Sequence, residues 1–147
     1  MVPEWKDHHV SDWTFFADPD EHRLIRHRSA QRFTAHARTS PQHYVPAALP
    51  TLPFPDGSFD LVLSSHLLFS YADDLDYDFH RRSILELARV TRSEIQLFPL
   101  MPVGSAHRYP QLDELLAELA RSGVTSRIVQ VDYEFQRGGN EMVVCRV

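Results

Sequence analysis

Four polar side chains at the end of one apolar run could together do chemistry. Ser64 and Ser65 close the segment 59–65, which is predicted as a strand, His66 follows directly, and Tyr71 lies a few residues on. An imidazole or a phenol can exchange a proton, and hydroxyl groups can hydrogen-bond a ligand. In open α/β sheets, ligands bind beyond the carboxyl ends of the strands. We therefore interpret His66 and Tyr71 as candidate catalytic residues; the alternative for His66 is a hydrogen-bonded structural role.

The sequence offers little for nucleophilic or metal chemistry. No G-x-S-x-G motif surrounds the serines, which argues against a serine hydrolase. The only cysteine, Cys145, excludes an internal disulfide and a cysteine-based zinc site, and its apolar neighbours predict a buried thiol. His8 and His9 are adjacent, and His22 and His27 are five apart, so neither pair has the i, i+4 spacing of two ligands on one helical face. We expect no metal site.

Composition and charge narrow the classes of protein further. The 147 residues suffice for one domain, and 43% apolar with 24% charged residues is ordinary for a globular protein. A net charge of −5 gives no reason to expect general affinity for nucleic acids or anionic membranes. No apolar stretch approaches the roughly 18 residues of a membrane span, and no signal-peptide core is present at the N-terminus. We therefore expect a cytoplasmic protein without a membrane partner.

Strands and helices alternate in the sequence from residue 43 onward. Apolar runs bounded by turn residues predict strands, and apolar positions at helical spacing predict helices. Gly138 and Gly139 tolerate positive φ and predict a hairpin between the last two strands. This order predicts an α/β sheet that is mostly parallel with an antiparallel edge. The expected strands are 43–48, 59–65, 93–99, 126–133 and 140–147, and the expected helices are 76–91 and 110–122.

Residues 1–43 form a polar, partly helical N-terminal segment whose composition differs from that of residues 44–147. Residues 21–38 are predicted as a helix with a thin apolar side. The segment 22–38 carries five arginines and no acidic residue, so it could bind an anion, a nucleic acid or a protein. Acidic residues in 1–21 balance this charge, and we therefore favour a solvated helix face and rank nucleic-acid binding last.

The sequence resembles the second half of a class I S-adenosylmethionine-dependent methyltransferase over residues 44–147. The resemblance is carried by "LPFPDGSFDLVLSSHLLF", then by "IQLFPL" between two predicted helices, and by the terminal hairpin. The words "LDYDFH", "ILELARVT" and "EFQRGGNEM" are similar to a group of bacterial methyltransferase-like proteins with no assigned substrate. The resemblance implies an incomplete doubly wound, Rossmann-like sheet with an antiparallel C-terminal hairpin at its edge.

The resemblance also implies S-adenosylmethionine as the cofactor and places parts of its site. Ala48 occupies the position where the family often has an aspartate facing the adenine, so only backbone groups of Ala48 and Leu49 could serve it. Ser64 and Ser65 would contact the cofactor at the strand end. The family's glycine-rich turn should come earlier, but the first glycine of the chain is Gly57. The resemblance thus implies a truncated cofactor site that binds poorly or not at all alone.

Loss of the preceding strands would leave strand 59–65 with an open edge. In the family's strand order, 3-2-1-4-5-7-6, this strand pairs with the first strand. Segment 43–48 could move over and take that place. A second copy of the chain or a complementary N-terminal half could also cover the edge, or the protein could begin further upstream.

Two functions remain open at this point. The first is a truncated methyltransferase-like protein with no assigned acceptor and no activity of its own. The second is a non-catalytic interaction module that binds a protein through the open edge or through the arginine-rich helix 22–38. Oligomeric behaviour separates them, because an edge-mediated module should dimerise or retain a partner.

Overall fold

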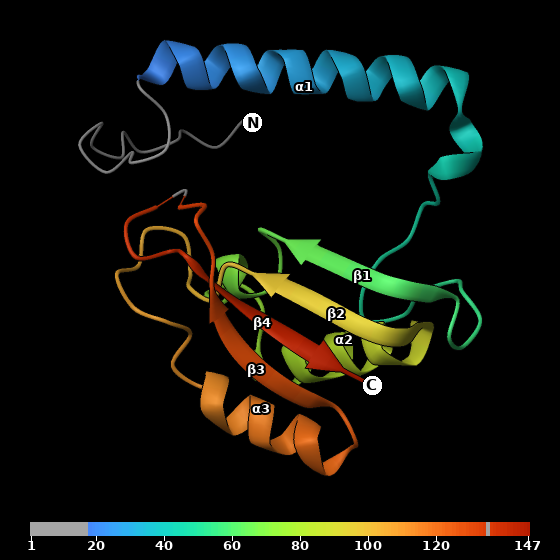
Figure 1. The fold of residues 1–147 in the computed structure, drawn as a ribbon, viewed down its shortest axis with the longest axis vertical. Helices are drawn as coiled ribbons and strands as arrows, with labels where there is room; N and C mark the ends of the chain where they lie inside the picture. The colour runs from blue at the N-terminus through green and yellow to red at the C-terminus, as the bar shows by residue number, and fades with distance from the viewer. Residues whose placement is uncertain (1–17, 135) are drawn as a thin grey trace.

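The computed structural model describes residues 18–134 and 136–147, which form one sheet, two helices packed on it and a helix that lies apart (Figure 1). Helix 21–38 is confirmed with slightly wider bounds, and the other predicted helices are confirmed with slightly narrower ones. The elements are α1 (Pro19–Thr39), η2 (Pro41–His43), β1 (Phe59–Ser65), η3 (Phe69–Tyr71), α2 (Tyr77–Val90), β2 (Thr91–Phe98), α3 (Leu112–Arg121), β3 (Thr125–Gln130) and β4 (Glu141–Arg146).

The four strands form an open mixed sheet in the order β1-β2-β4-β3. β1 runs parallel to β2, while β4 is antiparallel to both of its neighbours, β2 and β3. This confirms the predicted fold class, a partial Rossmann-like α/β sheet with an antiparallel hairpin at its edge. The expectation of a mostly parallel sheet is wrong, because one pairing among the described strands is parallel and two are antiparallel. The order equals the last four positions of the strand order expected from the resemblance.

The hydrophobic core lies between the sheet and the helices α2 and α3. Alternate residues of the central strands point into it, among them Ile95 and Leu97 of β2 and Val143 of β4, each at most 1% exposed. Ile84 of α2 and Leu115 of α3 meet them from the helical side, and both are fully buried. The two helices therefore bury their apolar stripes against one face of the sheet, as the helical spacing of these residues predicts.

Local signals at the helix ends act as expected. The side chain of Asp76 accepts a hydrogen bond from the backbone N–H of Phe79 at 2.7 Å and so caps α2. Gly123 follows α3 with a φ of 91°, a left-handed conformation that glycine adopts without strain. Asp76 is thus accounted for by helix capping.

The predicted strand 43–48 is wrong. Residues 41–43 form the 3-10 helix η2, and Ala48 makes only an isolated bridge to Thr51. The physical reason is the pair of prolines at 46 and 50, because proline has no N–H to donate to a strand ladder. The proposed pairing of this segment with strand 59–65 is therefore wrong as well, and β2 is the only strand that pairs with β1 among the described residues.

The C-terminal hairpin is confirmed, but its connection is longer than the tight turn expected at Gly138 and Gly139. β3 ends at Gln130 and β4 begins at Glu141, and the N–H of Val131 donates to the carbonyl of Asn140 at 2.8 Å. Gly138 has a φ of 79°, so the positive φ expected there is present within this longer loop.

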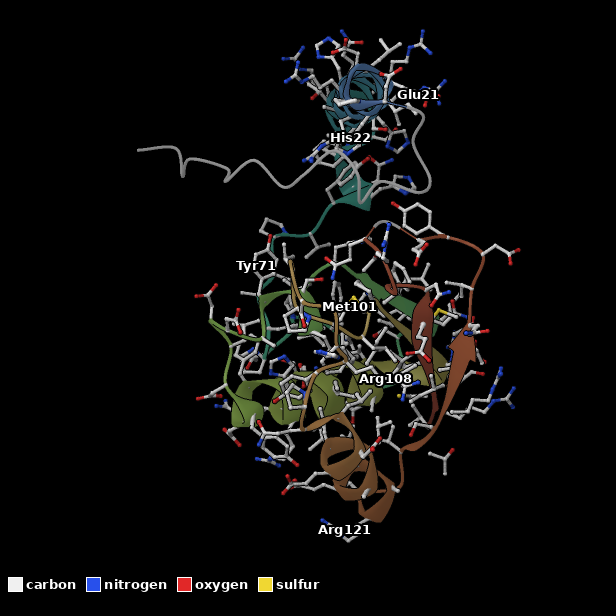
Figure 2. The ribbon with its side chains drawn as sticks, turned by 90° about the vertical axis from the view of Figure 1, so that its left-hand side faces the viewer. Glu21, His22, Tyr71, Met101, Arg108 and Arg121 are labelled. Carbon is white, nitrogen blue, oxygen red and sulfur yellow. The ribbon has the colours of Figure 1, made fainter. Side chains whose placement is uncertain are left out.

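Helix α1 lies apart from the sheet, at the top of Figure 1, and none of its residues is buried. Figure 2 views it end-on, with side chains projecting on all sides. Its C-terminal half contacts the segment that follows: the Phe33 and Tyr44 rings meet edge-to-face at 5.1 Å, and His36 Nδ1 lies 2.8 Å from the Tyr44 hydroxyl. Neither α1 nor any other helix in the described part of the chain is long and apolar enough to cross a membrane.

The buried thiol of Cys145 gives a first testable prediction. Cys145 is 0% exposed at the centre of the sheet, and burial raises its pKa from 9.0 to about 11. A two-unit rise makes the reactive thiolate roughly a hundredfold rarer at neutral pH, in addition to the steric block. We expect no reaction with Ellman's reagent in the native protein and one equivalent of released thiolate in denaturant. Rapid labelling of the native protein would contradict this burial.

Candidate functional site

A pocket of about 480 Å³ lies at the open edge of the sheet, between the segment before β1, the end of β1 and helix α2. Its walls are largely apolar, with the Ser64 hydroxyl as a polar side-chain group. Three of the four residues predicted to bind a cofactor, Ala48, Leu49 and Ser64, are among those that line it. The lining residues are Ala47, Ala48, Leu49, Leu52, Leu63, Ser64, Leu67, Phe79 and Leu87.

Leu52, which forms part of one wall of the pocket, is hydrogen-bonded to an ion pair on α2. Glu86 Oε1 accepts a hydrogen bond from the backbone N–H of Leu52 at 2.7 Å. Arg89 donates to both carboxylate oxygens of Glu86, at 2.7 and 2.8 Å. The same guanidinium donates to the Phe54 carbonyl at 2.9 Å, to Asp56 Oδ1 at 2.7 Å and to the Leu52 carbonyl at 3.3 Å. These two side chains of α2 therefore bond the loop that begins at Leu52 at four points.

Both members of this ion pair have pKa values shifted in the direction that favours their charged forms. Hydrogen bonds from Arg89 and from the Leu52 N–H lower the pKa of Glu86 from 4.5 to about 2. The bonds to Glu86 and Asp56 raise the pKa of Arg89 further above its usual value. Both groups are thus charged at neutral pH.

Acid should weaken this attachment in a defined window. A carboxylate with a depressed pKa stabilises the fold fully above its unfolded value, 4.5, and loses that contribution as the pH falls towards about 2. We expect Glu86→Gln to be less stable than the parent at neutral pH, with the difference shrinking as the pH falls through this window. Urea midpoints across the pH series measure this difference in stability.

As a control, Asp60→Asn removes an exposed ion pair with Arg92 and should change the stability little. A stability difference between Glu86→Gln and the parent that stays constant down to pH 2 would contradict the assignment.

Ser65 and His66 lie next to the pocket rather than in it. The Ser65 hydroxyl is 2.7 Å from His66 Nδ1. His66 has a φ of 53°, a left-handed conformation that strains a residue with a side chain, and its N–H donates to the Phe98 carbonyl at 2.7 Å. Its ring lies 5.4 Å from the Phe98 ring and 6.4 Å from the Tyr133 ring.

Burial shifts the pKa values of His66 and Tyr133, two members of this group of rings. It lowers the pKa of His66 from 6.5, so that the imidazole is neutral at pH 7 and has a nitrogen able to accept a proton. It raises the pKa of Tyr133, which therefore keeps its hydroxyl proton. The arrangement provides a neutral base, one adjacent hydroxyl and two aromatic rings at the carboxyl ends of β1 and β2.

Tyr71 stands apart from the other predicted site residues. Its side chain is 48% exposed and does not line the pocket, and it lies towards the upper part of the body in Figure 2. Its backbone N–H donates to the carbonyls of Leu67 and Leu68, both at 3.2 Å, and closes the turn after His66. The assignment of His66 and Tyr71 as catalytic residues stays a prediction.

A buried aromatic stack supports the turn that carries these residues. The rings of Phe69, His80 and Tyr109 all contact one another, with centroids 5.4 Å apart for Phe69 and His80, 4.9 Å for His80 and Tyr109, and 5.4 Å for Phe69 and Tyr109. His80 Nδ1 is 2.7 Å from the Asp76 carbonyl, and Nε2 is 3.1 Å from the Leu68 carbonyl. The stack therefore ties α2 to the segment between His66 and Tyr71.

The apolar walls from α2 and the ion pair of Glu86 with Arg89 were not predicted from the sequence. The Glu-x-x-Arg spacing within the predicted helix 76–91 could have indicated an ion pair on that helix. It does not show which loop the pair contacts. In the described part of the chain, no three His, Cys, Asp or Glu side chains are grouped as a metal site.

Comparison with known proteins identifies the family. Residues 18–98, more than half of the chain, match the methyltransferase domain family, and the chain belongs to it. This family normally uses S-adenosylmethionine. The match begins at Asp18, which caps α1 by accepting from the N–H groups of Asp20 and Glu21, both at 2.8 Å.

A curated relative extends the likeness along the chain. It is an uncharacterized protein of Methanocaldococcus jannaschii, 32% identical over 135 residues. The aligned part covers 92% of this chain but 58% of the relative, so the chain spans little more than half of that protein's length. No solved structure matches the chain.

Proposed function

We propose that this chain supplies the C-terminal part of an S-adenosylmethionine-dependent methyltransferase site. The observation that carries the proposal is the pocket at the end of β1, where Ala48 and Leu49 meet Ser64 across apolar walls. Backbone groups of Ala48 and Leu49 would serve the adenine, and Ser64 with Ser65 would contact the rest of the cofactor. His66 and Tyr71 would face the methyl acceptor, which is unassigned.

Catalysis in such a site is mainly positional. The acceptor must be aligned with the methyl group of the cofactor, and a nearby neutral base takes the proton that the acceptor releases. His66 suits that second role because its burial favours the neutral imidazole. Its ring packs beside the rings of Phe98 and Tyr133, which also contact each other.

We infer further that the cofactor site is incomplete within these 147 residues. The first glycine is Gly57, so no glycine-rich turn precedes β1 to surround the methionine part of the cofactor. The pocket is also open along the unpaired edge of β1. We therefore propose that these residues alone bind the cofactor weakly, and that further chain completes the site along this edge, either another copy, a complementary N-terminal half or a segment upstream of residue 1.

The test is a titration of the folded chain with S-adenosylhomocysteine, followed by calorimetry and by backbone amide shifts. We expect weak binding, with a dissociation constant on the order of 1 mM, and shifts centred on Ala48, Leu49 and Ser64. Ser64→Ala should weaken binding further, whereas Ser126→Ala, a half-buried strand serine outside the pocket, should not. Micromolar affinity would overturn the incomplete site, and shifts elsewhere or none would overturn the cofactor assignment.

A second candidate function has its own observation. Leu61 and Leu63 on the edge strand β1 are 49% and 66% exposed, and α1 has no buried residue. An apolar edge with free backbone groups favours pairing with another strand. On this alternative the chain is a non-catalytic interaction module that binds a protein through β1 or through the arginine-rich helix. Stable association without any cofactor binding would favour it.

A further inference from the structure

The loop between the pocket wall and β1 has few hydrogen bonds of its own. Three of its residues, Pro50, Pro53 and Pro55, have no N–H group, so the loop cannot satisfy its carbonyls internally. The bonds within it are local ones, from the Thr51 N–H to the Ala48 carbonyl at 3.2 Å and from the Ser58 hydroxyl to the Pro55 carbonyl at 2.6 Å. Contacts with other elements must therefore hold the loop in position.

Helix α2 supplies that support almost entirely through two side chains. Glu86 holds the Leu52 N–H, and Arg89 holds the carbonyls of Leu52 and Phe54 together with the Asp56 carboxylate. The backbone of the helix adds one bond, from the Gly57 N–H to the Arg89 carbonyl at 2.8 Å. Both backbone polar groups of Leu52, a pocket-lining residue, are therefore bonded to this ion pair.

We propose that Glu86 and Arg89 are positioning residues that set the shape of the pocket without lining it. They hold Leu52, and through the turn from Ala48 to Thr51 they hold the wall formed by Ala48 and Leu49. The next residue of the helix, Leu87, lines the pocket from the other side, so the pair fixes one wall directly relative to the other. The part of this inference that concerns cofactor affinity rests on the proposed function.

The guanidinium is needed for its shape as well as for its charge. Arg89 uses Nε, Nη1 and Nη2 to reach acceptors on Glu86, Leu52, Phe54 and Asp56. A lysine ammonium is a compact point charge and cannot span these acceptors at once. The side chain of Glu86 is 13% exposed, so an altered partner would not be replaced fully by water. Arg89→Lys therefore separates positioning from charge.

The test compares local and global amide exchange in Arg89→Lys and Glu86→Gln. We expect exchange at Leu52 and Gly57 to accelerate at least tenfold, with broadened signals from Ala48 and Leu49. Amides of the central strand residues Ile95 and Val143 should keep their protection. Arg81→Lys is the matched control, since Arg81 lies on the same helix, forms an ion pair with Asp78 at 2.7 Å, and is remote from the loop.

The outcomes separate the positioning role from both a structural role and the proposed function. Unchanged exchange at Leu52 and Gly57, or equal acceleration at core and loop amides, would overturn the positioning role. If the parent binds S-adenosylhomocysteine, Arg89→Lys should raise the dissociation constant at least tenfold while the urea midpoint moves no more than for Arg81→Lys. If the parent does not bind it, the proposed function fails, and local exchange alone decides the positioning role.

Discussion

Replacing Phe69 by alanine is expected to lower the free energy of unfolding by about 4 kcal/mol. Phe69 is 2% exposed, and its ring lies 5.4 Å from both the His80 and the Tyr109 rings. Truncation removes the ring from the core and leaves a cavity beside His80, whose ring nitrogens lie 2.7 and 3.1 Å from the Asp76 and Leu68 carbonyls. Urea denaturation followed by circular dichroism measures the change.

An exposed phenylalanine provides the control for this substitution. Phe33 on α1 is 58% exposed, and Phe33→Ala should change the free energy of unfolding by less than about 0.5 kcal/mol. A loss of under about 1 kcal/mol for Phe69→Ala would mean that the stack is not part of the cooperative core. Because Phe69 lies between His66 and Tyr71 in the chain, such a result would also remove the main support for a fixed geometry at those two residues.

Most of the sheet follows from patterns that are local in the sequence. β1 has the bounds expected from a turn at Pro55-Asp56-Gly57 followed by an apolar run, and α2 begins directly after its acidic cap at Asp76. The strand predicted at 43–48 does not form. Its apolar residues resemble those of a strand, but Pro46 and the following Pro50 interrupt the ladder. Residues 43–48 are all exposed, so here the apolar pattern indicated neither burial nor a strand.

The candidate site was less predictable because its contacts are distant in sequence. The carboxyl end of β1 was identifiable in advance, since a parallel strand places its last residues at the ligand-binding edge. The pairing of Glu86 with Leu52 joins residues 34 positions apart, and no periodicity reports it. The left-handed backbone of His66 was equally hidden, since nothing in the residue type requires a φ of 53°.

Charging the open edge of β1 is expected to abolish the self-association proposed for this chain. Leu61 and Leu63 lie on the same face of β1, and no strand in the described part of the chain pairs with their outer edge. Lysines on an edge strand oppose strand pairing because a second strand would have to desolvate or clash with them. We expect the parent to associate in sedimentation velocity and the double variant Leu61→Lys, Leu63→Lys to be monomeric, with an association constant at least a hundredfold lower.

A matched control separates loss of the edge from a general gain in solubility. Val103 and Val147 are 49% and 54% exposed and lie outside β1, so lysines there add the same charge to other apolar surface. That variant should associate like the parent. If both variants remain associated, contact is made through another surface, and the arginine-rich α1 becomes the next element to test. If the parent is monomeric at all concentrations, the chain does not complete its sheet with a second copy, and the proposal of a self-association through β1 is overturned.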